Sequence, residues 1–265
     1  IIAIDEGTTS TRAVLYDLDK KKITAQKASP VKQIYPEQGY VEENAGEIYA
    51  ETLASLVEMI EQADKPENIL GIGVTNQRET VIAWDKTTGK PLYNAIVWQC
   101  RRTAEIIAEI GEKHGGTIRE KTGLVLDAYF SASKMKWLMD NVPAIREKAA
   151  AGELCFGTVD SFLCYKLTGG KAFVTDVTNA SRTMLFNIHT CEWDDELLNI
   201  FGIPKSSLPK VIMSDETVGE FEYNGVKIPV CGVAGDQQAA LVGQGCLNVG
   251  DSKITYGTGL FMLYN

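Results

Sequence analysis

The chain has 265 residues, of which 45% are hydrophobic, so it is long enough to bury a sizeable core in one large domain or two modest ones. Its formal net charge is −9 at pH 7, and it contains no run of basic residues. This balance argues against a nucleic-acid-binding surface, which draws its affinity from clustered lysine and arginine.

The six cysteines are scattered without C-x-x-C spacing, and only two histidines accompany them. This pattern argues against a structural zinc site and against a disulfide framework. We therefore expect reduced thiols and a cytoplasmic protein. Polar residues and glycines interrupt every apolar stretch, so no membrane span is expected.

The chain opens with two short aliphatic and β-branched runs, residues 1–5 and 12–17, joined by the loop GTTST at residues 7–11. Residues 22–27 form a third run after the polar turn LDKKK. Runs of this length and composition predict strands, and their close spacing predicts a β-meander.

The next apolar residues predict an amphipathic helix over residues 46–63, which should cover the sheet. Asn44 lies just upstream, where its side chain can cap the helix. The apolar positions follow an i, i+4, i+7, i+11 spacing: Tyr49, Leu53, Leu56 and Ile60.

A series of strands is expected next. A buried strand is predicted to end at Thr75, before the polar segment NQRE at residues 76–79. A second strand runs to Trp84, and after a DKTTGK turn a third ends at Trp98. Polar residues thus follow strand ends, where ligands gather in open α/β sheets.

Residues 101–152 have a mainly helical pattern, in which Ser131 or Ser133 is expected to cap one helix and Pro143 to start another. Residues 153–228 mix short helices and strands, and no linker can be placed there.

The last segments are clearer. Residues 227–245 predict a strand, a tight glycine turn with Asp236 at its exit, and a helix. Residues 252–265 predict a strand, a GTG loop and a strand, which resembles a degenerate repeat of the chain's beginning. Since a lone hairpin is marginally stable, we expect a fragment: a complete domain over residues 1–253 and the first hairpin of a second domain over residues 254–265.

The loop after the first strand is a candidate phosphate site. Backbone N–H groups and hydroxyls of a Gly/Thr turn can surround phosphate oxygens, and a neighbouring carboxylate can hold Mg²⁺ through water. The residues concerned are Asp5, Gly7, Thr8, Thr9, Ser10 and Arg12. The alternative is an ordinary polar hairpin turn, although such turns are usually shorter.

Asp236 and Gln237 form a second candidate site. An aspartate between a strand and a helix is most often a helix cap. If Asp236 also faces a cleft, its carboxylate can orient a substrate hydroxyl and take its proton, as phosphoryl transfer to an alcohol requires.

Arg78 and Glu79 form the third candidate. They can be an exposed ion pair of little consequence, or they can bind a polyol, with arginine donating to one hydroxyl and glutamate accepting from its neighbour. Trp98 and Tyr129 can pack against the carbon chain of such a ligand, or they can belong to the core.

Taken together, these segments resemble the FGGY family of carbohydrate kinases and, within it, the kinases that act on glycerol. The resemblance covers the whole chain in order: IAIDEGTTSTRAV, GVTNQRETVIAW, YNAIVWQCRRTAE, TGLVLDAYFSASKMKWLMD, FGTVDSFLCYKLT, VTDVTNASRTMLFNIHT, AGDQQAALVGQ and TYGTGLFML. It implies an α/β fold, an actin-like, ribonuclease H-like domain whose mixed sheet is flanked by helices. Two such domains would close over a cleft.

The resemblance also implies roles for individual residues. Asp236 would be the catalytic base. The residues that would bind glycerol are Arg78, Glu79, Trp98, Tyr129, Asp236, Gln237 and Phe261. The residues that would meet the ATP phosphates are Thr8, Thr9, Ser10, Arg12, Gly257 and Thr258, with Asp5 linked to the metal. Glu6 departs from the family, which commonly has glutamine there, and adds a negative charge beside the phosphate site.

The implied activity is the ATP- and Mg²⁺-dependent phosphorylation of glycerol to sn-glycerol 3-phosphate in glycerol catabolism, by in-line transfer in a cytoplasmic transferase. Whether the protein forms a homo-oligomer is left open by the sequence. One alternative is a sister kinase of the family that acts on a ketopentose or another sugar. Another is an actin-like nucleotide switch, although Asp236 with Arg78 and Glu79 argues against it. The fragment itself is expected to bind ligands but to have little activity alone.

Overall fold

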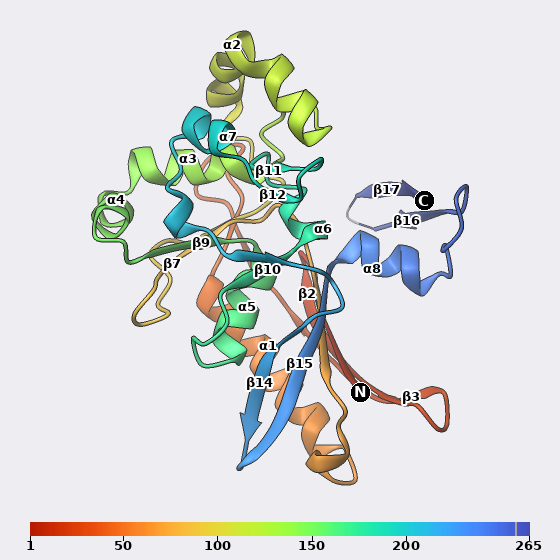
Figure 1. Ribbon diagram of the computed structural model, residues 1–265. Helices are drawn as coiled ribbons and strands as arrows, with labels where there is room; N and C mark the ends of the chain where they lie inside the picture. The colour runs from red at the N-terminus through yellow and green to blue at the C-terminus, as the bar shows by residue number, and fades with distance from the viewer. Residues whose placement is uncertain (258) are drawn as a thin grey trace.

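A mixed, six-stranded sheet lies at the centre of the computed structural model, which describes residues 1–257 and 259–265 (Figure 1). Its strand order is β14-β15-β6-β1-β2-β3. The three central strands, β15, β6 and β1, run parallel, and the outer pairs are antiparallel. The bounds are β1 Ile2–Glu6, β2 Ser10–Asp17, β3 Lys22–Pro30, β6 Ile72–Asn76, β14 Thr217–Tyr223 and β15 Val226–Gly235. The expected α/β class with a mixed sheet is confirmed.

The N-terminal meander forms as predicted. β1 pairs with β2 and β2 with β3, both antiparallel. Ile2 and Ile4 are fully buried while Ala3 between them is exposed, because successive side chains of a strand point to opposite faces. One face of the meander therefore belongs to the core.

Helix α1, Ala45–Glu61, packs across β1, β2 and β3, and α5, Val159–Leu167, lies beside it against β6 and β15 (Figure 1). The cap predicted at Asn44 is confirmed, since its side chain accepts hydrogen bonds from two backbone N–H groups of the first turn. The apolar side of α1 includes Ile48 and Leu56, both fully buried against the strands. These two helices close one face of the sheet.

A second core lies away from the central sheet, among α2 Ala104–Thr122, α3 Ser131–Asn141, α4 Pro143–Ala150 and α7 Asp195–Phe201. Pro143 is the first residue of α4, as predicted. The predicted serine cap of α3 is wrong. Ser131 is already helical and its hydroxyl donates to the Glu79 carbonyl (3.1 Å), while the Ser133 hydroxyl shares a hydrogen bond with Thr103 (2.8 Å).

Among the described residues, several two-stranded sheets and one three-stranded sheet lie outside the central sheet. The strand predicted to end at Trp98 is only β8, Ala95–Ile96, because the chain turns at Val97, whose carbonyl accepts from the Cys100 N–H (2.9 Å). The remaining short elements are β4 Gln33–Ile34, β5 Glu42–Glu43, β7 Ile82–Asp85, β9 Leu154–Gly157, β10 Val174–Asp176, α6 Val177–Ala180, β11 Phe186–Asn187, β12 Glu192–Trp193 and β13 Lys210–Ile212. Single 3₁₀ turns are formed by Pro66–Asn68 and Lys205–Ser207.

The C-terminal part contains helix α8, Asp236–Gly243, and a hairpin of β16, Ser252–Tyr256, and β17, Leu260–Tyr264. The tight glycine turn predicted before Asp236 is wrong, because β15 continues to Gly235 and the helix starts at the next residue. The flexibility of glycine is used further upstream. Gly232 has φ +83° within an irregularity of the pairing with β6.

In the part of the chain that the structure describes, no helix has both the length and the apolar composition needed to cross a membrane. The six cysteines, all among the described residues, form no disulfide in the structure. Cys100, Cys155, Cys164 and Cys246 are buried, whereas Cys191 is exposed and Cys231 lies between these extremes.

Candidate active site

The three parallel strands of the sheet end in register. Glu6 of β1 lies opposite Asn76 of β6, which lies opposite Gly235 of β15. The last residues of these strands, and the residues that follow them, therefore lie together at one edge of the sheet. Asp5, Arg78 and Asp236 come together there although they are far apart in the sequence.

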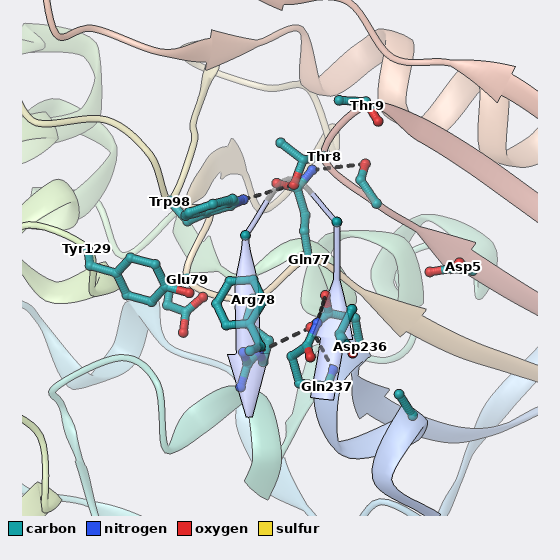
Figure 2. Close-up of a pocket in the computed structure, with 16 residues that line it drawn as sticks. Asp5, Thr8, Thr9, Gln77, Arg78, Glu79, Trp98, Tyr129, Asp236 and Gln237 are labelled. Carbon is teal, nitrogen blue, oxygen red and sulfur yellow. Dashed lines mark hydrogen bonds and ion pairs between the residues drawn. The ribbon is translucent and has the colours of Figure 1, made fainter. Parts of the chain in front are cut away.

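A pocket of about 310 Å³ opens at this edge (Figure 2). Most of the residues predicted for the site line it: Asp5, Thr8, Thr9, Arg78, Glu79, Trp98, Tyr129, Asp236, Gln237, Gly257 and Phe261. Gly7 of the candidate phosphate loop also lines it. Four further residues line it that were not predicted for the site: Gln77, Ala240, Thr255 and Gly259. The pocket thus joins the Gly/Thr loop, the Arg-Glu pair and the aspartate that the sequence analysis singled out separately.

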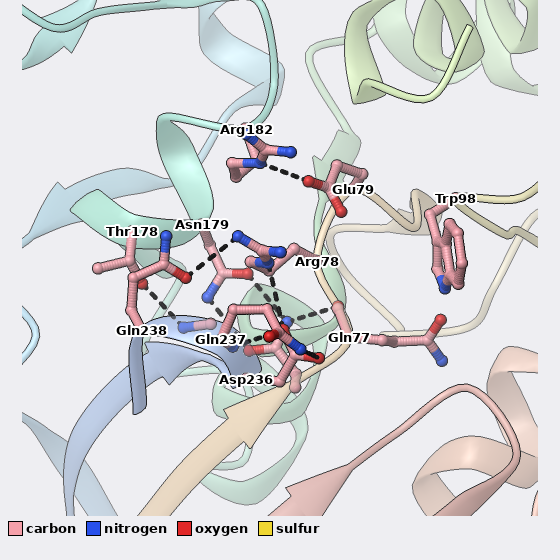
Figure 3. A network of polar contacts seen from close by, with 12 residues as sticks. Gln77, Arg78, Glu79, Trp98, Thr178, Asn179, Arg182, Asp236, Gln237 and Gln238 are labelled. Carbon is pink, nitrogen blue, oxygen red and sulfur yellow. Dashed lines mark hydrogen bonds and ion pairs between the residues drawn. The ribbon is translucent and has the colours of Figure 1, made fainter. Parts of the chain in front are cut away.

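Arg78 and Asp236 form an ion pair inside the pocket. The Arg78 Nε lies 3.2 Å from the Asp236 Oδ1, and the guanidinium also donates to Gln238 Oε1 through Nη1 (3.3 Å; Figure 3). The Arg78 side chain is 5% exposed, whereas that of Asp236 is 33% exposed. The carboxylate can therefore meet a ligand while its partner stays buried.

Asp236 is the first residue of α8, and Gly235 is its N-cap, so the predicted capping role of the aspartate is wrong. Its carboxylate accepts from Gln237 instead, through the backbone N (2.7 Å) and Nε2 (3.0 Å). A Cβ at Gly235 would lie 2.5 Å from the Arg78 Cδ. Glycine is needed here because the strand backbone passes directly against the arginine stem.

Glu79 is held in an unusual backbone conformation. Its φ is +62°, a region that non-glycine residues rarely adopt, and its side chain is 1% exposed. Arg182 donates from Nε to the Glu79 Oε1 (2.5 Å; Figure 3). Burial raises the pKa of Glu79, and the charges of Arg182 and Arg78 oppose that rise. Such strain persists only where the surrounding contacts enforce it, which is common at functional sites.

Aromatic rings form the apolar side of the pocket. The Trp98 ring packs edge-on against Tyr129 and Phe261, with centroid distances of 5.5 and 6.1 Å. The Trp98 Nε1 donates to the Thr8 hydroxyl (2.8 Å), which ties the wall to the Gly/Thr loop. Phe261 comes from β17, so the C-terminal hairpin contributes to the same pocket.

Comparison with known proteins identifies the family of the chain. Residues 1–243 match the model of the FGGY family of carbohydrate kinases, N-terminal domain. The chain belongs to the FGGY family of carbohydrate kinases.

Among curated relatives of this FGGY domain, the glycerol kinase of Bacillus thuringiensis (strain Al Hakam) is 55% identical over 270 residues, covering 100% of this chain and 54% of that protein. The crystal structure of Plasmodium falciparum glycerol kinase with ADP has a TM-score of 0.94 at 38% identity, over 100% of this chain and 54% of that one. A xylulose kinase from Lactobacillus acidophilus, with a TM-score of 0.85 at 23% identity over 98% of this chain and 53% of that one, shares the fold. The chain spans about half the length of the curated relatives it matches.

Some predicted residues of the FGGY domain lie outside the pocket. Among the described residues, Ser10 and Arg12 do not line it. Ser10 begins β2, where its carbonyl accepts from the Gly7 N–H (3.0 Å), and the exposed Arg12 lies opposite Asp5 across the β1–β2 pair. Thr258, predicted to meet ATP phosphates, lies outside the described residues.

Glu6 belongs to a buried cluster behind the Gly/Thr loop. Gln77 donates from Nε2 to Glu6 (3.3 Å) and to Glu43 (2.9 Å), and both glutamates are fully buried. Burial raises the pKa of Glu43 to about 7 and that of Glu6 well above its usual value, to which the neighbouring Glu43 charge contributes. Glu6 is buried and is not among the residues that line the pocket, so its carboxyl does not face the site proposed for phosphate.

This cluster predicts a pH-dependent stability. When burial raises the folded-state pKa of a carboxyl, the free energy of unfolding falls as the pH rises from the unfolded pKa, here 4.5, through the folded pKa. For Glu43 the cost at pH 8 is about 3 kcal/mol. Glu43→Gln is therefore expected to be more stable than wild type at pH 8 and nearly unchanged at pH 4.5, as measured by urea unfolding.

The neighbouring Glu42 provides the matched control. It lies on the same short strand and is ion-paired with Arg102 (2.7 Å), so Glu42→Gln should lower the free energy of unfolding at pH 8. If Glu43→Gln kept the pH profile of the wild type, the buried carboxyl would not be the group that titrates.

Proposed function

We propose that this chain forms the polyol-binding half of a kinase that transfers the γ-phosphoryl group of ATP to a terminal hydroxyl of glycerol, giving sn-glycerol 3-phosphate. The observation that carries the proposal is the convergence of Arg78, Glu79 and Asp236 at the ends of parallel strands, in a small pocket that also contains the Gly/Thr loop. An arginine and two carboxylates at one side of a pocket suit a ligand with adjacent hydroxyl groups.

In this proposal Asp236 is the general base. Its partly exposed carboxylate accepts the proton of the attacking hydroxyl as the bond from that oxygen to the γ-phosphorus forms and the bond to the β–γ bridging oxygen breaks, releasing ADP. Arg78 holds the carboxylate in place through their ion pair, and Gln237 donates to the same carboxylate through its backbone N–H and Nε2.

Glu79 and Tyr129 face the same pocket, where we assign them to the other hydroxyls of glycerol. Trp98 and Phe261 would pack against its carbon chain and exclude water, which is a competing nucleophile. Thr8, Thr9 and Gly257 would surround the ATP phosphates. For Ser10 and Arg12 the same role stays a prediction, because neither lines this pocket. For Thr258 it stays a prediction because that residue lies outside the described part of the chain.

Asp5 fits a magnesium ion by its chemistry. Its side chain lines the pocket. Burial raises the pKa of Asp5, and the charge of the neighbouring Asp236 adds to that rise while Arg12 opposes it. Carboxylate and phosphate oxygens are the ligands that Mg²⁺ prefers, and a bound ion supplies positive charge to the phosphate oxygens.

Two further assignments complete the proposal. We infer a first domain over residues 1–253, supported by the central sheet, and assign residues 254–265 to a second domain, supported by the separate pairing of β16 with β17. We also infer a cytoplasmic location, supported by the free thiols.

The test is to titrate the chain with glycerol, xylulose, ribulose and gluconate by calorimetry, and to measure ADP release from MgATP with each. Binding that is clearly strongest for glycerol, with slow or no ADP release, is the expected result. Preference for a sugar or sugar acid would overturn the substrate, and ADP release indifferent to every polyol would favour a nucleotide switch.

A further inference from the structure

Lys134 is a fully buried lysine in the first turn and a half of α3. Its ammonium group donates to three consecutive backbone carbonyls, those of Ala128 (2.8 Å), Tyr129 (2.5 Å) and Phe130 (3.0 Å). An ammonium group has three N–H donors, so all of them are used on one short segment. Burying a lysine is costly, and here the hydrogen bonds hold the loop between α2 and α3 in a fixed shape.

That loop carries part of the pocket wall. The Tyr129 side chain lines the pocket against Trp98, while its carbonyl makes the shortest of the lysine hydrogen bonds. The first residue of α3, Ser131, donates to the Glu79 carbonyl (3.1 Å). The hydrogen bond from Lys134 therefore fixes the backbone of Tyr129. The first residue of α3 is in turn hydrogen-bonded to the backbone carbonyl of the strained Glu79.

We propose that Lys134 is a positioning residue for the acceptor pocket: its ammonium group fixes the backbone of residues 128–130 and so holds Tyr129 and Glu79 in place for the polyol. The inference rests on the proposed function for the identity of the ligand. The positioning of Tyr129 can be measured without any ligand.

The surroundings of Lys134 give the arrangement a pH dependence. Burial lowers the pKa of Lys134 to about 7, and the charge of Glu79 opposes this shift. The other charged or titratable groups that act on it are Asp127, Cys100 and Arg101. Above pH 7 the neutral amine keeps only two donors for three carbonyls, so the loop should loosen as the pH rises from 6 to 9.

The test compares Lys134→Met with a matched control, Lys136→Met. Lys136 lies on the same helix, but its side chain is 32% exposed and pairs with Asp140 one turn away (3.0 Å). Two readouts are used: the affinity for glycerol by calorimetry, and the ¹⁹F signal of Tyr129 in protein labelled with fluorotyrosine, assigned with Tyr129→Phe.

Lys134→Met is expected to weaken glycerol binding by about 10- to 100-fold and to shift and broaden the Tyr129 signal, because small displacements of positioned groups have effects of this size. In the wild type and Lys136→Met the Tyr129 signal should titrate near pH 7, and in Lys134→Met this titration should be lost. An unchanged Tyr129 signal and affinity in a folded Lys134→Met protein would overturn the proposal.

If Lys134→Met does not fold, Lys134→Gln, which keeps an NH₂ donor, takes its place with the same criteria. Failure of both variants to fold would assign the lysine to the folding core and also overturn the proposal. If the wild type binds no glycerol, the proposed substrate fails, while the Tyr129 signal still decides whether Lys134 positions the pocket wall.

Discussion

In the chain extended through the second domain inferred above, replacing Asp236 by asparagine is expected to reduce glycerol-dependent ADP release by about 10² to 10⁴, the range for a positioned general base. Asparagine has nearly the same shape and can still accept a hydrogen bond, but it cannot take the proton of the attacking hydroxyl. Because the Arg78 side chain is only 5% exposed, losing the charge of its partner should also lower the melting temperature, and the asparagine oxygen should limit that loss. Initial rates of ADP release and thermal unfolding of the same preparations measure both effects.

Gln238→Ala separates the chemistry from the positioning of Arg78. It removes the other side-chain partner of the guanidinium (3.3 Å) and leaves the carboxylate in place, so we expect a change of only a few-fold. Asp236→Asn should also keep glycerol affinity within a few-fold of the wild type. Near-normal turnover in Asp236→Asn would show that the aspartate only neutralises Arg78.

The edge of the sheet that carries the site could be predicted from the sequence because local patterns define it. The aliphatic runs before Gly7 and Asn76 are short and end abruptly in polar residues. Parallel strands place such ends side by side, which brings the Gly/Thr loop next to Arg78. The cap at Asn44 was predictable for the same reason, since it depends on residues within one turn.

The supports of the site could not be predicted, because they depend on contacts between distant segments. Arg182 reaches Glu79 across 103 residues, and nothing in its own segment distinguishes it from a surface arginine. From the sequence, Lys134 would be expected to face solvent on a helix, because the contact that buries it comes from the preceding loop, whose carbonyls accept its hydrogen bonds. Ser131 looked like a cap because its partner, the carbonyl of Glu79, is remote in sequence.

The ion pair between Arg182 and the buried Glu79 is expected to contribute to the stability of the site. In Arg182→Met the buried carboxylate loses its cation, and because Arg182 is itself 24% exposed we expect a loss at the lower end of the range for buried pairs, about 3 kcal/mol at pH 8. Burial already raises the pKa of Glu79, and removing the arginine raises it further. Since a raised carboxyl pKa destabilises as the pH rises through it, the loss should be smaller at pH 5 than at pH 8.

The double variant Glu79→Gln/Arg182→Met separates the ion pair from packing, because Arg182 also stacks on Phe130 (4.9 Å from guanidinium to ring centroid). If the unpaired charge causes the loss, the double variant should recover most of the free energy of unfolding in urea, and its pH dependence should disappear. It should not recover glycerol binding, since the carboxylate that would accept from a hydroxyl is gone. Equal destabilisation of the single and double variants would instead assign the loss to the missing cation–π contact, and Glu79 would then be held in its strained conformation by its backbone alone.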